Sequence, residues 1–304
     1  MARDPGIAAN GTDNGTRNGI GDGSGDWTPP TDLAERIKQA LVPPAVDIRR
    51  RVNRELRKGE AEFALVPHLC AADKDAIDIG ANRGVYTWWM ARSARHVHAF
   101  EPNPKMLGIL NRVLPGNATS YGIGLSDAPG DATMFIPQRR KGYSNQGGSL
   151  SERKAEIPHG EVRVETRTLD SYNFTNIGFI KIDVEGFEAP VLKGAQETLA
   201  RERPNLLIEL EEAHTGTPIE AMLADIEAMG YRGLFMRRGQ LTALERFDPE
   251  AHHRNTGGRA DYVFNFIFLP VGVILLVLWG TGIWLFFDPH VKRWLRRRRR
   301  AERP

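Results

Sequence analysis

The side chains best suited to acid–base chemistry follow two short apolar segments of the chain. Asp183 comes directly after 179–182, whereas Glu209 and His214 lie at the end of 205–210 and just beyond it. An imidazole with an ordinary pKa of about 6.5 suits a general base, and carboxylates can fill the same role. Asp183, Glu209 and His214 are therefore candidate catalytic bases. The structural alternatives are an ion pair with Lys181 for the carboxylates and a solvent-facing loop for the histidine.

A glycine turn follows the apolar stretch 76–79. Glycine lets the backbone turn tightly and lets a ligand approach the main chain. The N–H groups of the helix expected after it present partial positive charge to a carboxylate or phosphate. A plain βαβ unit with a structural glycine is the alternative. The candidate ligand contacts around this turn are Asp78, Gly80, Ala81, Asn82 and Gly84.

Spacing discriminates among the nucleotide ligands of such a turn. Glu101 ends the next expected strand, 96–100, about twenty residues later, where a carboxylate can accept hydrogen bonds from two ribose hydroxyls. Asn103 lies beside it and joins the candidate contacts. The loop reads G-x-x-x-G and lacks the G-x-G-x-x-G that cradles a pyrophosphate, which argues against NAD and FAD. S-adenosylmethionine (SAM), which has no phosphate, fits this pattern.

The apolar pattern predicts an α/β fold whose sheet strands alternate with helices. Ser126 and Asp127 follow the third strand, where an acidic residue in a SAM-type sheet lies near the adenine amino group, although a turn aspartate is the alternative. The polar segment 137–154 is long enough to be a lid or a substrate loop. Sheet strands are expected at 76–79, 96–100, 118–125, 179–182, 205–210, 231–236, 240–244 and 261–269, the last at the sheet edge; further strands at 132–136 and 161–167; and helices at 31–41, 45–58, 60–69, 105–114, 189–200 and 219–229.

Composition and charge limit the class of protein. The 304 residues suit one main domain, 57–270, preceded by helices in 31–56 and by a Gly- and Asn-rich segment, 1–30, that we expect to be disordered. One cysteine excludes an internal disulfide framework. The formal charge of +3 is a property of the tail, because residues 288–304 carry +6 and the remainder carries −3. A nucleic-acid groove in the main domain is therefore not expected.

The C-terminal region predicts attachment to a membrane. Residues 271–287 form an uncharged run of seventeen residues, about 26 Å long as a helix, which only just covers a hydrocarbon core of about 30 Å. The basic tail 288–304 suits anionic headgroups. With no signal peptide at the N-terminus, the catalytic domain is expected in the cytoplasm, and the positive-inside rule keeps the tail there too. A segment that crosses the membrane once would place the domain and the tail on opposite sides. A re-entrant or interfacial segment keeps both in the cytoplasm, and a buried core helix is the alternative.

The ordered motifs resemble one known family. The segments DIGANRGVYT, AFEPNP, TLD, IKIDVEGFEAPVLKGA, NLLIELEE and YVFNFIFLP are similar, in this order, to the FkbM family of SAM-dependent methyltransferases, over roughly residues 57–270. The resemblance implies a class I methyltransferase fold, with a Rossmann-like, seven-stranded, mostly parallel sheet. It also implies methyl transfer, usually to a hydroxyl oxygen. By resemblance, Asp78, Gly80, Asn82 and Gly84 would border the methionine end of SAM, Glu101 would hold the ribose, and Asp183 would face the methyl group.

A sulfonium methyl is already activated, so such an enzyme must chiefly align an acceptor oxygen and remove its proton. Asp183 with Glu209 or Glu211 offers hard oxygen ligands that suit Mg²⁺, but we expect no metal. The expected acceptor is a glycan, a lipid-linked sugar or another hydroxylated metabolite. A membrane-anchored binding module without turnover, or an NAD-dependent dehydrogenase, are the alternatives.

Overall fold

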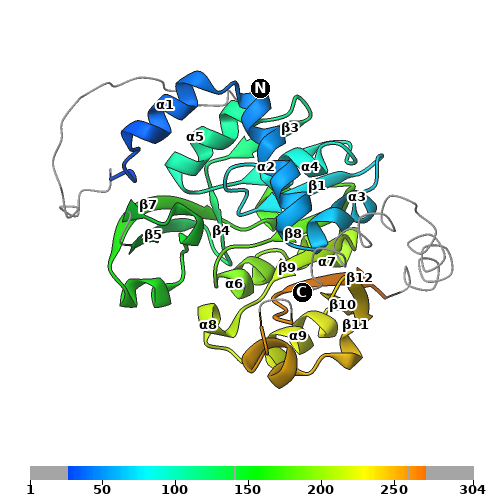
Figure 1. Ribbon diagram of the computed structural model, residues 1–304. Coiled ribbons are helices and arrows are strands. Elements are labelled where there is room, and N and C mark those ends of the chain that lie inside the picture. The colour runs from blue at the N-terminus through cyan, green and yellow to red at the C-terminus, as the bar shows by residue number, and fades with distance from the viewer. Residues whose placement is uncertain (1–26, 140–141, 259–260, 272–304) are drawn as a thin grey trace.

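A central sheet organises the molecule. The computed structural model describes residues 27–139, 142–258 and 261–271. Eight strands lie in the order β11-β10-β12-β9-β8-β1-β2-β3, and helices pack around them (Figure 1). These strands are β1 (Asp75–Ile79), β2 (Val97–Phe100), β3 (Ala118–Tyr121), β8 (Ile177–Ile182), β9 (Asn205–Glu209), β10 (Tyr231–Arg237), β11 (Gln240–Ala243) and β12 (Asn265–Pro270).

The pairing corrects two details of the predicted sheet. Strands β3, β2, β1, β8 and β9 are mutually parallel, as expected for a mostly parallel sheet. The described sheet has eight strands rather than the seven that the family resemblance implies, since the β10–β11 hairpin adds a strand at the edge. The last strand, β12, is antiparallel as predicted, but it lies between β9 and β10. Every residue of β12 is buried, which requires neighbours on both sides.

A smaller second sheet stands beside the first, to its left in Figure 1. Its strands are β4 (Gly124–Leu125), β5 (Gly130–Arg139), β6 (Gly142–Tyr143) and β7 (His159–Arg167), in the order β4-β7-β5-β6. The strands expected at 132–136 and 161–167 are thus confirmed, and they pair antiparallel with each other. Val162 and Val164 alternate with exposed polar residues and pack on Met134 and Ile136.

The helices cover both faces of the main sheet. They are α1 (Leu33–Leu41), α2 (Pro44–Lys58), α3 (Val66–Leu69), α4 (Val85–Met90), α5 (Pro104–Val113), α6 (Glu188–Lys193), α7 (Gln196–Glu202), α8 (Glu212–Thr215) and α9 (Ile219–Ala228). Shorter turns are η1 (Glu62–Leu65), η2 (Asn145–Gly147), η3 (Glu152–Glu156), η4 (Asp170–Tyr172), η5 (Leu244–Arg246) and the π-helical η6 (Glu250–Arg254).

Alternation along the strands decides what each face buries. On one face, Ile77 and Ile180 join a core with residues of α6, α7 and α9. On the other, Ala76 and Phe179 pack with residues of η1, α3 and α4. Asp78 and Lys181 are register partners on adjacent strands β1 and β8. Because side chains alternate with a period of two, both project into this second layer, where their charges need partners.

The predictions for the two termini fall mostly on residues outside the described ones. These are the disordered segment for 1–26, the apolar segment from 272 to 287 and the basic tail 288–304. In residues 27–139, 142–258 and 261–271, no helix has the length and apolar character needed to cross a bilayer.

Candidate functional site

A cavity opens at the carboxyl ends of β1, β2 and β8, the edge at which open parallel sheets bind ligands. It encloses about 590 Å³ of empty space, counting the part open to solvent. Its walls come from the loops after these strands, from both strands β4 and β5 of the small sheet, and from the segment after β6. The residues lining it include Gly80, Asn82, Glu101, Ile123, Leu125, Met134, Asn145, Ser149, Leu150, Asp183 and Glu185.

Glu101 is the best-fixed carboxylate in this cavity. Its side chain is buried, and its two oxygens accept hydrogen bonds from the backbone N–H of Asn82, at 2.7 Å, and of Asn103, at 2.8 Å. Burial raises the pKa of Glu101 to about 7, against the lowering effect of these two hydrogen bonds. Each oxygen keeps a lone pair for a further donor. The carboxylate is therefore pre-oriented to accept from a ligand.

Gly80 lets two strand ends approach closely. It has φ +79°, and a Cβ there would lie 1.8 Å from the carbonyl oxygen of Asp183. Neither the conformation nor the space admits another residue without rearrangement. The glycine turn after β1 therefore lies directly against the end of β8, which brings Asp183 into the cavity wall.

Asn82 offers an unused acceptor. Its φ is +50°, a conformation that asparagine tolerates better than most residues. Its side-chain Oδ1 is buried and has no hydrogen-bond partner among the described residues. A buried acceptor without a partner is costly, so a ligand amino group at this wall of the cavity would satisfy it.

Residues after β6 close the cavity from the small-sheet side. The Ser149 hydroxyl donates to the carbonyl of Val184 at 3.0 Å, and Lys154 forms an ion pair with Glu185 at 3.0 Å. Two contacts thus join this segment to the loop after β8. The predicted lid or substrate loop, 137–154, therefore contributes to the wall of the site. It contains β6 and η2, the end of β5 and the start of η3.

A buried lysine balances the carboxylates beneath the cavity. The Nζ of Lys181 lies 2.8 Å from Asp183 Oδ2 and 4.6 Å from the ring centre of Tyr86. Burial alone would lower the pKa of Lys181, but the negative charges of Asp183 and Asp78 outweigh it and raise the pKa. Burial raises the pKa of Asp78, which accepts a hydrogen bond from Thr87 at 2.6 Å. The ion pair with Lys181, which the sequence offered as the structural alternative for these carboxylates, is thus present at Asp183.

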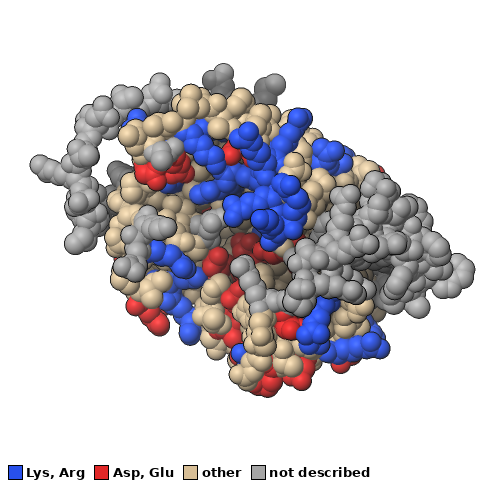
Figure 2. All heavy atoms as spheres, in the orientation of Figure 1, with Lys and Arg blue, Asp and Glu red and all other residues tan. Residues whose placement is uncertain are grey.

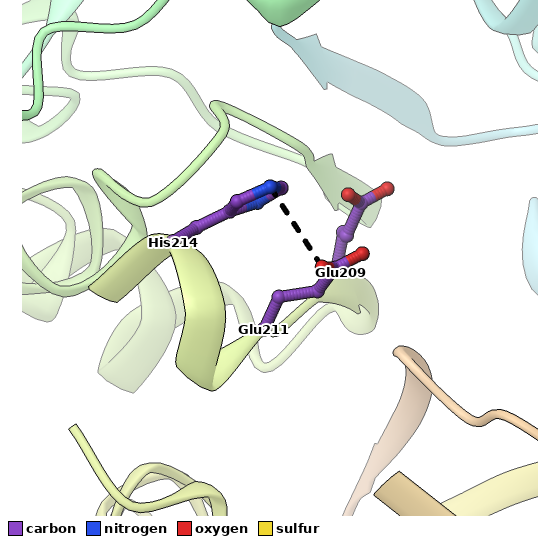
Figure 3. Close-up of side chains that lie close together, drawn as sticks. All are labelled: Glu209, Glu211 and His214. Carbon is purple, nitrogen blue, oxygen red and sulfur yellow. Dashed lines mark ion pairs between the residues drawn. The ribbon is translucent and has the colours of Figure 1, made fainter. Parts of the chain in front are cut away.

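Two of the candidate bases meet beside the cavity. Figure 3 shows His214 on α8 facing Glu211, with Glu209 at the end of β9 next to them. The Nε2 of His214 lies 3.7 Å from Glu211 and 3.6 Å from Glu185. Burial, reinforced by the charges of Asp183, Glu60 and Glu185, holds the pKa of Glu209 well above its ordinary value. Burial and these charges thus raise the proton affinity of Glu209 above that of an ordinary glutamate, as a general base requires.

The same side chains could also hold a cation. Ligand atoms of Asp183, Glu185 and Glu209 lie within 4.8 Å of one another, as do those of Glu209, Glu211 and His214. Acidic residues gather in a hollow in Figure 2, directly below a dense group of Lys and Arg over α2. The acidic group in this hollow thus lies next to the basic group over α2.

Comparison with known proteins decides the family. The methyltransferase FkbM domain model matches residues 78–232, about half of the chain. The chain belongs to the FkbM methyltransferase family. It is 28% identical over 184 residues to methyltransferase sdnD of Sordaria araneosa, covering 49% of this chain and 71% of that protein. It is 26% identical over 161 residues to methyltransferase 1 of Beauveria bassiana (strain ARSEF 2860), covering 45% and 65%.

A crystal structure of an FkbM methyltransferase from Methylobacillus flagellatus KT superposes with a TM-score of 0.43 at 17% identity, covering 77% of this chain and 57% of that one. The resemblance read from the ordered motifs is thus confirmed by the family model. The matched range runs from β1 to β10 and includes both the glycine turn and the acidic strand ends.

Within this FkbM domain, the structure separates the predicted contacts into those that line the cavity and those that support it. Gly80, Asn82, Glu101 and Asp183 line it. The other predicted cofactor contacts do not: they are Asp78, Ala81, Gly84, Asn103, Ser126 and Asp127.

The supporting residues have identifiable structural roles. Asn103 caps α5 and donates to Asn145, a residue of the cavity wall, at 3.2 Å. Gly84 precedes α4 with φ +78°. Asp127 is not brought to the FkbM cavity, because its carboxylate pairs at the surface with Lys193 of α6, at 2.8 Å.

Sequence reasoning assigned no individual role to the apolar wall of the cavity. This wall is formed by Ile123, which precedes β4, by Leu125 in β4 and by Met134 in β5. Leu150, in the segment after β6, completes it. These residues look like ordinary core residues in the sequence. The only local signal was the long Gly- and Ser-rich stretch around 144–151.

Proposed function

We propose that this FkbM methyltransferase transfers the methyl group of SAM to a hydroxyl oxygen of a glycan, a lipid-linked sugar or another hydroxylated metabolite. The observation that carries the proposal is the carboxylate of Glu101, held by two backbone N–H groups in a cavity that Gly80 opens at the end of β1. No phosphate-cradling glycine pattern accompanies it, which disfavours a dinucleotide.

The cavity residues fit the parts of SAM. Glu101 would accept hydrogen bonds from the two ribose hydroxyls. The unpartnered Oδ1 of Asn82 would accept from the amino group of the methionine portion. Ile123, Leu125, Met134 and Leu150 would provide an apolar slot for a planar base.

SAM supplies an activated methyl group, so the chain must align an acceptor oxygen and accept its proton. Among the candidates, Asp183 is engaged by Lys181 at 2.8 Å. The side chain of Glu209 forms no hydrogen bond or ion pair with the described residues, and its pKa is raised. We assign the proton transfer to Glu209, with His214 and Glu211 beside it. Methyl transfer to an oxygen needs no metal in this scheme.

Attachment to a membrane is part of the proposal. It is supported by the uncharged sequence 271–287 and the basic tail that follows it. Deleting residues 271–304 should release the enzyme into the soluble fraction, whereas an alkaline carbonate wash should not. Release of the full-length protein by carbonate would contradict insertion and leave only electrostatic attachment.

Calorimetry with SAM, followed by transfer of labelled methyl to membrane and polysaccharide extracts, tests the central assignment. Binding together with a labelled, base-stable product supports O-methylation of a hydroxyl. Absence of SAM binding would overturn the enzyme assignment, and binding without any labelled product would favour a non-catalytic module.

The raised pKa of Glu101 predicts that SAM affinity depends on pH. Only the ionised carboxylate can accept hydrogen bonds from both hydroxyls, so binding should release a proton. With a pKa of about 7, the ionised fraction and hence the affinity should rise about tenfold between about pH 6 and pH 8. Glu101→Gln should bind more weakly and show a flat profile, and Glu165→Gln, an exposed control on β7, should behave as the wild type. A wild-type affinity independent of pH would contradict this role.

A further inference from the structure

A second cavity adjoins the first and is lined by cations. It lies between α1, α2, α5 and β6, and holds about 1,520 Å³ of empty space, counting the part open to solvent. Asn145 lines both cavities, and Arg83 follows directly after Asn82 of the cofactor cavity. The two cavities therefore share part of their wall, and a group bound in the second cavity lies next to the cofactor cavity.

Most cations of the second cavity already have partners. Lys38 and Arg51 both contact the carboxylate of Asp47, at 3.3 and 2.8 Å. Lys105 pairs with Glu35 at 2.8 Å. These contacts account for the carboxylates of Glu35 and Asp47. The third carboxylate of the lining, Asp32, caps α1 by accepting from the N–H of Glu35 at 2.7 Å and has no ion pair with the described residues.

Two guanidinium groups of the lining have no carboxylate partner among the described residues. Within that part of the chain, Arg112 hydrogen-bonds the neutral side chain and the carbonyl of Gln39 and nothing else. Arg83 has no ion pair with any of the described residues, and its Nε is buried without a hydrogen-bond partner among them. Burial and the neighbouring charge of Arg51 both lower the pKa of Arg83, although Glu35 and Asp47 act in the opposite direction.

These guanidinium groups are energetically unfavourable in the second cavity unless a ligand binds there. A buried donor without a partner costs free energy, and like charges close together add to that cost. A bound oxyanion would remove both costs, because its negative charge offsets the like charges and its oxygens accept from the free N–H group. A guanidinium presents parallel N–H groups that match a carboxylate or a phosphate. The cavity is wide enough to admit more than an isolated ion.

We propose that the second cavity binds an acidic group of the acceptor, a carboxylate or a phosphate, through the guanidinium of Arg83. This rests on the proposed function, because it assigns a substrate class to the same reaction: a hydroxylated acceptor that also carries an oxyanion. The methionine carboxylate of SAM is a competing ligand of the same chemistry. Arg83 lines only the second cavity, whereas Asn82 lines the first, which favours the acceptor.

The test uses the full-length protein and inorganic pyrophosphate as the probe. Calorimetry in the presence of saturating S-adenosylhomocysteine should detect binding to the wild type. Arg83→Gln should weaken it at least about tenfold, the range expected for a charged hydrogen bond, and Arg83→Lys, which keeps the charge, should weaken it less. Arg92→Gln is the matched control, since Arg92 lies over the rings of Trp88 and Trp89 and lines neither cavity.

A second measurement needs no variant. In the labelled-methyl assay, pyrophosphate should raise the apparent KM for the acceptor extract and leave the KM for SAM unchanged. Pyrophosphate that fails to bind the wild type, or binds Arg83→Gln equally well, would overturn the proposal. So would an Arg83→Gln variant whose affinity for SAM falls tenfold, because the guanidinium would then bind the cofactor. Failure of the wild type to bind SAM, with pyrophosphate still bound, would contradict the proposed function and not the anion site.

Discussion

Replacing Lys181 by methionine is expected to lower the free energy of unfolding by about 3–5 kcal/mol at pH 8, the range found when one partner of a buried ion pair is removed. Methionine keeps the length of the stem but leaves Asp78 and Asp183 without their cation. Asp78 is fully buried and has one oxygen without a hydrogen-bond partner among the described residues. Chemical denaturation followed by circular dichroism measures the change.

Lys193→Met is a matched control for this variant. Lys193 also contacts an aspartate, Asp127, at 2.8 Å, but its side chain is 69% exposed against 5% for Lys181. Solvent screens such a pair, so its loss should leave the unfolding transition almost unchanged. Equal effects of the two substitutions would show that burial does not set the strength of the Lys181 contact.

The destabilisation by Lys181→Met should shrink as the pH falls. Without the lysine, the pKa of Asp78, already raised by burial, rises further above its value in the unfolded chain. A carboxyl group with a raised folded-state pKa binds more protons in the folded state, so stability falls as the pH rises through that pKa. The difference from the wild type should therefore be largest at pH 8 and smaller at pH 5. A difference independent of pH would point to lost packing instead.

The local sequence was sufficient to predict those elements that a single strong pattern of residues marks. Apolar runs bounded by Gly80 and Asp183 placed β1 and β8, and the distance from the turn to Glu101 placed a carboxylate in the cavity. Each of these depends on residues close in the chain or on a fixed strand-to-strand geometry.

Predictions from the sequence were wrong where contacts between segments far apart in the chain determine the local structure. The helix expected at 189–200 is split into α6 and α7 near Gly194, where a Cβ would lie 2.0 Å from the carbonyl of Ser126. The helix expected at 60–69 divides into η1 and α3. A long-range contact also explains why Asp127 does not line the cavity, because its carboxylate forms an ion pair with Lys193 on α6. Such contacts have no local signature.

Replacing Glu209 by glutamine is expected to lower kcat about 10²- to 10⁴-fold, the contribution typical of a positioned general base. Glutamine keeps the size of the side chain but cannot accept the acceptor's proton. The Kd for SAM should not change, since Glu209 does not line the cofactor cavity. Labelled-methyl transfer at saturating SAM gives kcat, and calorimetry gives Kd. Glu245→Gln, which changes an exposed carboxylate paired with Arg232, should leave both unchanged.

The pH profile distinguishes a base from a residue that only maintains the structure around it. Burial and the charges of Asp183, Glu60 and Glu185 raise the pKa of Glu209, so wild-type kcat should rise with pH at values well above the ordinary glutamate pKa of about 4.3. The residual activity of Glu209→Gln should lack that rise. If the variant keeps both the rate and the profile, proton transfer belongs to Asp183 or His214. Because Asp183 is held by Lys181 and His214 lies between Glu185 and Glu211, Asp183→Asn and His214→Gln would then separate these two.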